Sequence, residues 1–336
     1  PTITAIVVVH GSAAATVAAA VESLLASTGV DVFVVLVDNA SPDGGVAVEP
    51  WRRHPRVVVV TSARNDGFAA GVNQALARRR RGDLVWLLND DATVEPDCLA
   101  HCAATLRGAG ARGAVVAAPR VMLASQPNLI DSLGVVLRRN GEAFNAFTGQ
   151  RWTGQVADGE TLTGACFAAG LFRADAFDAN SVGRLDQRYR LYYEDIDWGL
   201  RAAARGLTAV ASPDAVVHHV HAGSTRTLGE PARYELVQRN LLLCAAKNLT
   251  WRSALRVWAT RLAVHAKGTI TGPMRARRWK AVAAALVGLV PVVVARRRQP
   301  HLSLAAEAAL FARSEGHFPN IDTTTFLATP LATPDD

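Results

Sequence analysis

Two carboxylates stand directly after a strongly apolar run in VWLLNDDATVEP. The run predicts a buried strand, which ends abruptly at Asn89, Asp90 and Asp91. Proteins hold hard divalent cations such as Mg²⁺ and Mn²⁺ with one or two carboxylates together with substrate phosphates. The pair therefore indicates a cation site that can capture a phosphorylated substrate. The alternative is that Asp91 or Thr93 only caps a helix that begins at Pro96.

A second acidic group lies in LYYEDIDWGLRAAARG, where Glu194, Asp195 and Asp197 open a predicted helix that ends at Gly206. A helix N-terminus stabilises an ionised carboxylate, and an ionised carboxylate can act as a general base. Acids at a helix start also complement the helix dipole in proteins that do no chemistry, so this pattern alone leaves both interpretations open.

Histidines gather after another predicted strand, in VVHHVHAGST. A single histidine is more often a structural residue than a ligand. Three histidines within four positions, His218, His219 and His221, favour a role in binding a metal or a phosphate.

The elements that must position these groups alternate between strands and helices. Such alternation is typical of a parallel sheet covered by helices, whose strands all end at one edge, where open α/β sheets bind ligands. A polar or glycine-rich segment follows each of the first four strands. The predicted strands cover residues 3–9, 30–37, 56–61 and 83–88, and the helices between them cover 13–27 and 69–80.

The segment after the first strand excludes several nucleotide-binding classes. HGSAAAT contains a single glycine, whereas a dinucleotide-binding fold needs a glycine fingerprint at this point. The phosphate-loop pattern GxxxxGK[ST] is absent from the sequence, and a nucleotidyltransferase would need a glycine-rich N-terminal loop that is missing as well. Asp38, Asp90 and Asp91 would lie close together at this edge of the sheet, and their negative charges need a cation or hydrogen-bond donors to neutralise them.

Seven segments in a fixed order resemble the family 2 glycosyltransferases, over residues 3–250, and they resemble the bacterial rhamnosyltransferase-like branch most. They are DNASPDG, RNDGFAAGVNQA, LLNDDATVEPD, TGACFAAGLFRADAF, LYYEDIDWGLRAAARG, HHVHAGST and VQRNLLLCAAKN. The resemblance implies a GT-A fold: a Rossmann-like, mostly parallel α/β sheet flanked by helices. It also implies inverting transfer of a sugar from a nucleoside-diphosphate donor, dTDP-rhamnose or a similar compound, to an acceptor hydroxyl.

The resemblance also implies roles for individual residues. Asp195 corresponds to the catalytic base, with Glu194 beside it, and Asp91 and His219 correspond to positions that bind the metal, Mn²⁺ or Mg²⁺. The acceptor would meet Gly164, Ala165 and Cys166. The nucleotide-sugar would meet His10, Asp38, Arg64, Asn65, Gly71, Asn73, Asn89 and Asp90.

Two positions depart from the family pattern. Relatives usually have Asn or Tyr after the first strand, where this chain has His10 and Gly11, which bears on the contact to the nucleotide base. The NDD segment lacks the leading Asp of a strict DxD, which bears on metal dependence.

Charge is distributed unevenly along the 336 residues. Thirteen of the 36 Lys and Arg residues fall between Leu236 and Ala306, a stretch without Asp or Glu. The remaining 23 basic residues face 29 acidic residues, so an acidic body with a net charge of −6 carries a basic C-terminal region. Such asymmetry favours contact with a polyanionic surface, and the alternative is a solvated helical appendage.

The basic region predicts helices with apolar stretches. Trp251, Leu255, Trp258 and Leu262 cluster on one helix, and the apolar core of residues 274–298 is short and contains Pro291, which favours a helix lying at a membrane interface over a spanning one. Anionic lipid is the expected partner. Nucleic acid is disfavoured because basic and aromatic residues do not interleave as in known modules.

We expect a catalytic domain over residues 1–230, a helical basic extension over 231–317 and a loosely ordered tail over 318–336. Within the first, residues 1–113 would bind the nucleotide-sugar and 114–230 the acceptor. A polyprenyl-linked precursor and a soluble natural product both remain open as acceptors, and a homodimer is open too. Four cysteines make no disulfide framework, and no signal-peptide pattern opens the sequence, so we expect a cytoplasmic protein, peripheral at the inner face of the cell membrane. The rival hypothesis is a GT-A-like protein without activity that binds an anionic surface or nucleic acid.

Overall fold

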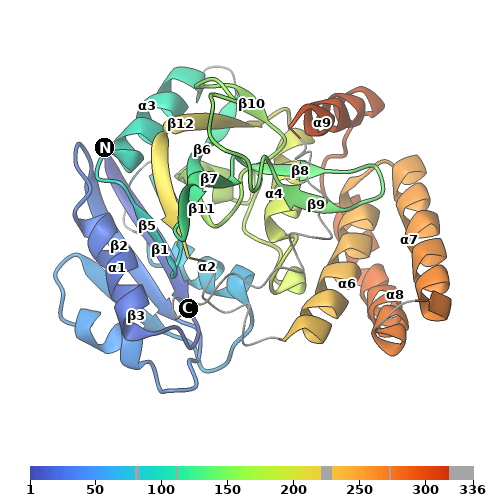
Figure 1. Cartoon of the computed structure of the whole chain (residues 1–336), viewed down its shortest axis with the longest axis horizontal. Helices are drawn as coiled ribbons and strands as arrows, with labels where there is room; N and C mark the ends of the chain where they lie inside the picture. Colours follow the sequence, from blue (N-terminus) through green and yellow to red (C-terminus); the bar gives the residue numbers. More distant parts are fainter. Residues whose placement is uncertain (80–81, 83, 111–112, 221–228, 272–273, 318–336) are drawn as a thin grey trace.

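The first four β-branched runs form parallel strands in the spatial order β3-β2-β1-β4, as the alternating pattern predicts. The computed structural model describes residues 1–79, 82, 84–110, 113–220, 229–271 and 274–317 (Figure 1). The predicted tail over 318–336 lies outside these residues. The elements of this half are β1 (Thr2–Val9), α1 (Ala14–Leu25), β2 (Asp31–Asp38), η1 (Val46–Trp51), β3 (Val57–Thr61), α2 (Phe68–Leu76) and β4 (Leu84–Asn89).

The register of these strands brings their carboxyl ends to one level. Val9 pairs with Asp38, Val8 pairs with Asn89, and Asp38 pairs with Thr61 on its other side. The polar segments that follow the strands therefore leave the sheet from the same edge.

The second half of the chain extends this sheet beyond β4. β11 runs antiparallel between β4 and β6, and β12 lies parallel to β6 on its outer side. The elements are β5 (Ala92–Val94), α3 (Cys98–Gly110), β6 (Ala114–Leu123), β7 (Gln126–Ser132), β8 (Val135–Leu137), β9 (Ala143–Asn145), β10 (Thr161–Leu162), β11 (Ala169–Arg173), η2 (Ala174–Phe177), η3 (Gln187–Tyr189), α4 (Glu194–Ala203) and β12 (Thr208–His219).

The segment after Asp91 differs from the prediction of a helix that begins at Pro96. Ala92–Val94 forms β5, which pairs antiparallel with the end of β12, and α3 begins only at Cys98. Because the backbone of β5 pairs with β12, the chain turns through residues 95–97 before the helix starts. Asp91 consequently precedes a strand, and helix capping does not account for it.

Among the described residues after β12, the chain forms α6 (Glu230–Asn248), α7 (Trp251–Thr271), α8 (Arg275–Arg297) and α9 (Leu304–Gly316). In Figure 1, α6, α7 and α8 gather on the side of the molecule away from β1–β3. These helices confirm the predicted C-terminal helical region of the fold. The four cysteines are free and buried.

A buried ionic network joins α6 to α4. Lys247 Nζ lies 2.7 Å from both Asp197 Oδ1 and Asp186 Oδ2. Arg201 Nε donates to Asp197 Oδ2 at 2.9 Å, and Asn248 Nδ2 donates to Asp197 Oδ1 at 2.8 Å. Asp197 is fully buried, and these donors satisfy its charge. Helix α6 is thus fixed to the helix that carries the predicted catalytic acids, and the division of the chain into domains stays a prediction.

Candidate active site

A cleft of about 620 Å³ opens at the carboxyl edge of the sheet. That volume falls in the range of small-molecule sites, which is about 300–1,000 Å³. Nine of the residues predicted to act in binding or catalysis line it: His10, Asn65, Asn89, Asp90, Asp91, Cys166, Glu194, Asp195 and His219. These residues come from segments up to about two hundred positions apart, and the sheet topology is what brings them together.

Strand pairing places His219 beside Asp91. His219 pairs with Ala92 in the β12–β5 ladder, so the histidine faces the residue that precedes β5. His219 Nε2 lies 3.0 Å from Asp91 Oδ1 and 3.3 Å from Asn89 Nδ2, while Nδ1 lies 2.8 Å from Asp131 Oδ2. The imidazole is therefore held at both nitrogens, with one nitrogen toward the cleft residue Asp91.

The two carboxylates also decide the charge of this imidazole. Burial lowers the pKa of His219, but the hydrogen bonds to Asp131 and Asp91 outweigh burial and raise the pKa to about 10. With His219 protonated, Asp91 and Asp131 leave this buried cluster with one net negative charge, which a further cation can neutralise.

The donor set at Asp91 and His219 suits a divalent metal. The carboxylate of Asp91 is a ligand that Mn²⁺ accepts, and His219 can add an imidazole nitrogen once metal binding displaces its Nε2 proton. The diphosphate of a substrate can complete the coordination. Among the residues that the structure describes, no group of three or more His, Cys, Asp or Glu side chains forms a ready metal cage. A metal here would thus depend on substrate oxygens for much of its shell.

Asp90, the residue before Asp91, has a different hydrogen-bond partner. Ser12 Oγ, from the loop after β1, donates to Asp90 Oδ2 at 2.6 Å. Burial raises the pKa of Asp90 to about 6, although the Ser12 hydrogen bond opposes that rise. The two adjacent acids therefore have separate partners, Asp90 on β1's loop and Asp91 on β12.

Glu194 and Asp195 stand at the start of α4, as predicted, after a strained approach. Arg190, Tyr192 and Tyr193 have positive φ angles of 62°, 67° and 73°. Each such residue costs on the order of 1–3 kcal/mol, so the surrounding structure must impose this conformation.

Asn240 of α6 imposes it. Its Nδ2 lies 2.9 Å from the carbonyl oxygens of Tyr189 and Leu191 and 2.8 Å from that of Tyr192. Asn240 is fully buried, so these contacts are shielded from water. One side chain therefore fixes the turn that aims the first residues of α4 into the cleft.

The two acids at the helix start differ in protonation. Burial raises the pKa of Asp195 to about 6, and three backbone N–H groups limit the rise. Burial and the neighbouring charge of Asp195 raise the pKa of Glu194 to about 8. Among the described residues, Glu194 Oε2 has no hydrogen-bond partner. At neutral pH the site therefore pairs an ionised Asp195 with a neutral Glu194.

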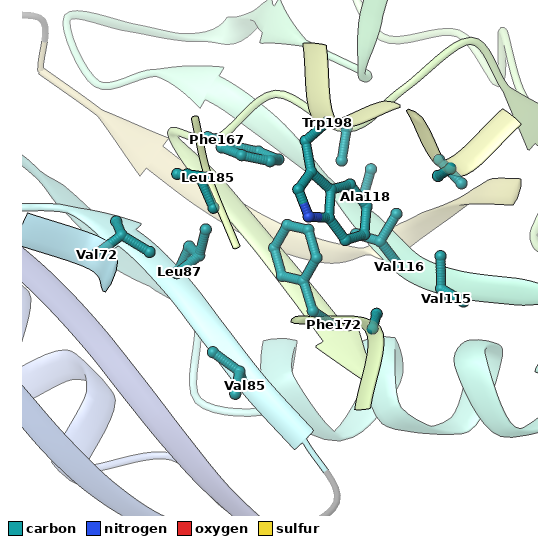
Figure 2. Packing of buried hydrophobic residues seen from close by; sticks show 14 of the residues in the cluster. Val72, Val85, Leu87, Val115, Val116, Ala118, Phe167, Phe172, Leu185 and Trp198 are labelled. Carbon is teal, nitrogen blue, oxygen red and sulfur yellow. The ribbon is translucent and has the colours of Figure 1, made fainter. Parts of the chain in front are cut away.

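Aromatic packing anchors α4 one turn further on. Figure 2 shows Trp198 lying against Phe172 of β11, with Phe167 nearby. The rings of Trp198 and Phe172 meet edge to face at 5.3 Å, and Trp198 Nε1 donates to Gly183 O at 2.9 Å. The helix that presents Asp195 is consequently fixed to the sheet itself.

The opposite end of the cleft is formed by amide and imidazole groups. His10 Nδ1 lies 3.0 Å from Asn39 O. Asn39 Nδ2 donates to Asn65 Oδ1 at 3.0 Å, and Gly67 N donates to the same oxygen at 2.9 Å. These contacts shape the loops after β1, β2 and β3 into one wall.

Four residues predicted to meet the nucleotide do not line the cleft. Asp38 is buried next to the lining residue Asn39 and accepts a hydrogen bond from Ser41 N at 2.9 Å. Arg64 is exposed and pairs with Asp66 at 2.8 Å. Their contacts to a nucleotide remain predictions.

The other two of these four residues serve the packing of α2. A Cβ at Gly71 would lie 2.6 Å from Val8 Cγ1, so glycine allows α2 to approach β1 closely. Asn73 exchanges two hydrogen bonds with the backbone of Leu185, at 2.8 and 3.1 Å. Gly71 fixes the distance between α2 and β1, and Asn73 fixes α2 to the segment at Leu185. Both residues therefore affect the cleft only through the position of α2.

The predicted acceptor residues divide between two hollows. Cys166 lines the main cleft, whereas Gly164 and Ala165 line a smaller cavity of about 150 Å³ between α4 and α9. Asp195 and Phe167 line both hollows. The smaller cavity therefore lies directly behind the predicted base.

Sequence reasoning missed four residues of the site. Arg190 and Arg233 line the cleft, Asp131 holds His219, and Asn240 fixes the turn before α4. Asn240 lies in the segment VQRN, which carried part of the family resemblance without an assigned role. No signal in the sequence singles out Asp131. His221, the third predicted histidine, lies outside the described residues.

Comparison with known proteins identifies the family. The model of glycosyl transferase family 2 matches residues 4–179, slightly more than half of the chain. The chain belongs to glycosyl transferase family 2. Glycosyl transfer is the reaction of this family, and the predicted family is thereby confirmed.

Two curated relatives support this membership. The chain is 28% identical over 264 residues to an N-acetylglucosaminyl-diphospho-decaprenol L-rhamnosyltransferase of Mycobacterium tuberculosis, covering 71% of this chain and 83% of the relative. It is 37% identical over 115 residues to the succinoglycan biosynthesis protein ExoO of Rhizobium meliloti, covering 34% of this chain. The chain spans about a third of the length of that second relative.

Solved structures share the GT-A fold. GalNAc-T7 with UDP, GalNAc and Mn²⁺ superposes with a TM-score of 0.61 at 12% identity, covering 84% of this chain and 54% of that chain. A Pyrobaculum calidifontis mannosyltransferase with GDP-Man and Mn²⁺ gives a TM-score of 0.51 at 18% identity, covering 92% and 86%. These likenesses confirm the predicted fold class, and both of those structures contain a divalent metal.

Proposed function

We propose that this chain transfers a sugar from a nucleoside-diphosphate donor to an acceptor hydroxyl, with inversion at the anomeric carbon. The observation that carries the proposal is the placement of Asp91 with His219 and of Asp195 with Glu194 in one cleft. The first pair suits a cation that grips a diphosphate, and the second offers an ionised base.

Five residues of the cleft have a place in this mechanism: Asp91, Arg190, Asp195, His219 and Arg233. Asp195, ionised above a pKa of about 6, accepts the proton of the acceptor hydroxyl as that oxygen attacks the anomeric carbon. Arg190 and Arg233 line the cleft, and their positive charge favours the departing diphosphate. Asp91 and His219 would hold a divalent cation, Mn²⁺ or Mg²⁺, which would add positive charge at the same diphosphate. A single displacement inverts the anomeric centre.

A relative that matches the chain over most of its length supports a proposal for the donor and the acceptor. The Mycobacterium tuberculosis protein is named for rhamnosyl transfer to an N-acetylglucosaminyl-diphospho-decaprenol. We propose dTDP-rhamnose as donor and a polyprenyl-diphosphate-linked sugar as acceptor. The diphosphate of such an acceptor is a second anion that suits a cleft lined by arginines.

The experiment incubates the protein with Mn²⁺ and a panel of UDP-, GDP- and dTDP-sugars and measures release of nucleoside diphosphate. Slow hydrolysis of dTDP-rhamnose is expected without acceptor, and Asp91→Ala should abolish it. The control Asp97→Ala removes an exposed acid of the next turn and should change nothing.

The acceptor step is tested separately, with a short-chain polyprenyl-diphosphate N-acetylglucosamine. Asp195→Asn should eliminate acceptor-dependent turnover, because the amide cannot take the proton. Acceptor-dependent turnover by the Asp195→Asn variant would show that Asp195 is not the general base. Failure of every donor in the panel would instead favour a binding protein without activity.

A further inference from the structure

One face of α8 exposes a stripe of large apolar side chains. Val287 and Val290 are 82% and 72% exposed, and the stripe runs along most of the helix. At about 3.6 residues per turn its members fall within about 100° around the helix axis, which places them on one side of the helix. The stripe consists of Trp279, Leu286, Val287, Val290 and Val294.

The opposite face of α8 is fixed to the body of the protein. Ala281, Ala285 and Val292 are buried on that face. A Cβ at Gly288 would lie 3.1 Å from a methyl group of Leu243 in α6, so the glycine lets the two helices pack closely.

Polar contacts complete this attachment. Arg296 donates to the carbonyl oxygens of Ala246 and Leu249 at 2.9 and 2.6 Å. Arg188 Nη1, just before the turn that carries the catalytic acids, donates to Pro291 O at 2.7 Å. By length and composition alone α8 could cross a membrane, with a mean hydropathy of 1.7 over its most apolar window. Its packing on α6 instead keeps it on the surface of the folded chain.

Cations frame the stripe at both ends. Exposed Arg275 and Lys280 stand near its start, and exposed Arg297 and Arg298 stand at its end. Trp279 supplies an exposed tryptophan at the first end of the stripe. Apolar residues between interfacial tryptophans and arginines are typical of a helix that lies in a membrane surface.

We propose that this α8 face docks on an anionic lipid bilayer, with the helix axis in the plane of the membrane. The stripe from Trp279 to Val294 is about 23 Å long at 1.5 Å per residue, so it rests on many headgroups at once. The docking does not depend on the proposed sugar transfer. It also places the cleft near the bilayer, because α6, on which α8 packs, supplies Arg233, Leu236 and Val237 to the cleft lining.

Charge favours lipid over a second copy of the chain as the occupant. Pairing two α8 faces would bring cationic ends against cationic ends, whether the helices run parallel or antiparallel. Glu235 of α6 pairs with Lys280 at 3.5 Å, and the stretch from Leu236 to Ala306 supplies no further Asp or Glu for Arg275, Arg297 and Arg298. Anionic headgroups supply the missing charge.

The test is co-sedimentation of the full chain with vesicles made of equal parts phosphatidylglycerol and phosphatidylcholine, and with vesicles of phosphatidylcholine alone. Binding is expected to the mixed vesicles and to weaken with added salt. The double variant Val287→Glu, Val290→Glu should bind them at least about tenfold more weakly, because two apolar contacts become acidic. The control Val46→Glu changes a 59% exposed valine of η1, far from α8 in the sequence, and should bind as the parent does.

A second variant guards against an indirect effect. Arg297→Ser with Arg298→Ser should weaken binding to the mixed vesicles while leaving the melting temperature unchanged, because both side chains are exposed. Three results would overturn the proposal: no binding of the parent chain, equal binding of the Val287 and Val290 double variant, or a parent dimer in light scattering that this variant dissociates.

Discussion

Replacing Asp197 with asparagine tests whether the buried network between α4 and α6 holds the helix that carries the proposed base, Asp195. The carboxylate is fully buried and accepts from Lys247, Arg201 and Asn248 at 2.7–2.9 Å. The asparagine side chain would keep the shape of aspartate but lose its charge. Its NH₂ group, a donor, would face the donor groups of Lys247, Arg201 or Asn248. Removing one partner of a buried ion pair costs about 3–5 kcal/mol, because the remaining charges stay buried.

We therefore expect Asp197→Asn to lower the free energy of unfolding by about 3–5 kcal/mol at neutral pH. Urea unfolding followed by tryptophan fluorescence measures this, since Trp198 is the next residue. The matched control is Asp175→Asn, which removes one partner of an exposed Arg–Asp pair and should cost less than about 1 kcal/mol.

The pH dependence adds a second check. Burial alone would raise the pKa of Asp197, but Lys247 and Arg201 outweigh burial and lower it. A lowered pKa means that the stabilisation is complete above the ordinary aspartate value of about 3.9 and disappears as the pH falls through the lower folded-state value. Parent and variant should thus converge only in strong acid. A parent and variant that unfold within about 0.5 kcal/mol of each other at neutral pH would refute the network's role.

Three further predictions concern the cleft. Turnover should fall about tenfold per pH unit below a pH of about 6, because protonated Asp195 cannot accept a proton, and a flat rate profile down to acid pH would contradict this. Asn240→Ala should destabilise the chain by about 2–3 kcal/mol, since buried carbonyls lose their donor, and should lower kcat without a matching rise in KM; an unchanged kcat would show that the turn holds itself. Asp91→Ala should weaken Mn²⁺ binding by at least about tenfold in a spin-resonance titration without substrate, whereas equal affinity would place the metal elsewhere.

The half of the fold formed by β1–β4 was predictable because its strands can be identified from local sequence patterns. Runs such as VDVFVVLV are buried on both faces of a parallel sheet, so their composition alone indicates strands. Since parallel strands end at one edge, the acids after β4 could be assigned to a ligand site from the sequence alone. Asp91 and Asp195 do line one cleft, whereas Asp38, expected beside them, is buried next to it.

The remaining features depend on contacts between distant segments. Asp131 of β7 and His219 of β12 are 88 residues apart, and their contact follows from the pairing of both strands with β6, which no local sequence pattern predicts. Asn240 acts about fifty residues away from the turn it fixes. The exposed stripe on α8 could not be predicted either, because an apolar helix in sequence does not say which of its faces the protein covers.

The family model covers a shorter segment of the chain than the segment needed for a stable fold, which includes α6. The family model ends at residue 179, yet the lysine that neutralises Asp197 lies at position 247 and the asparagine that fixes the turn before α4 lies at 240. A trimmed protein ending near residue 230 would leave a carboxylate in its interior with half its counter-charge and a strained turn without support. We expect a protein limited to the segment that matches the family model to aggregate on expression. A minimal enzyme should therefore extend beyond the end of α6 at Asn248.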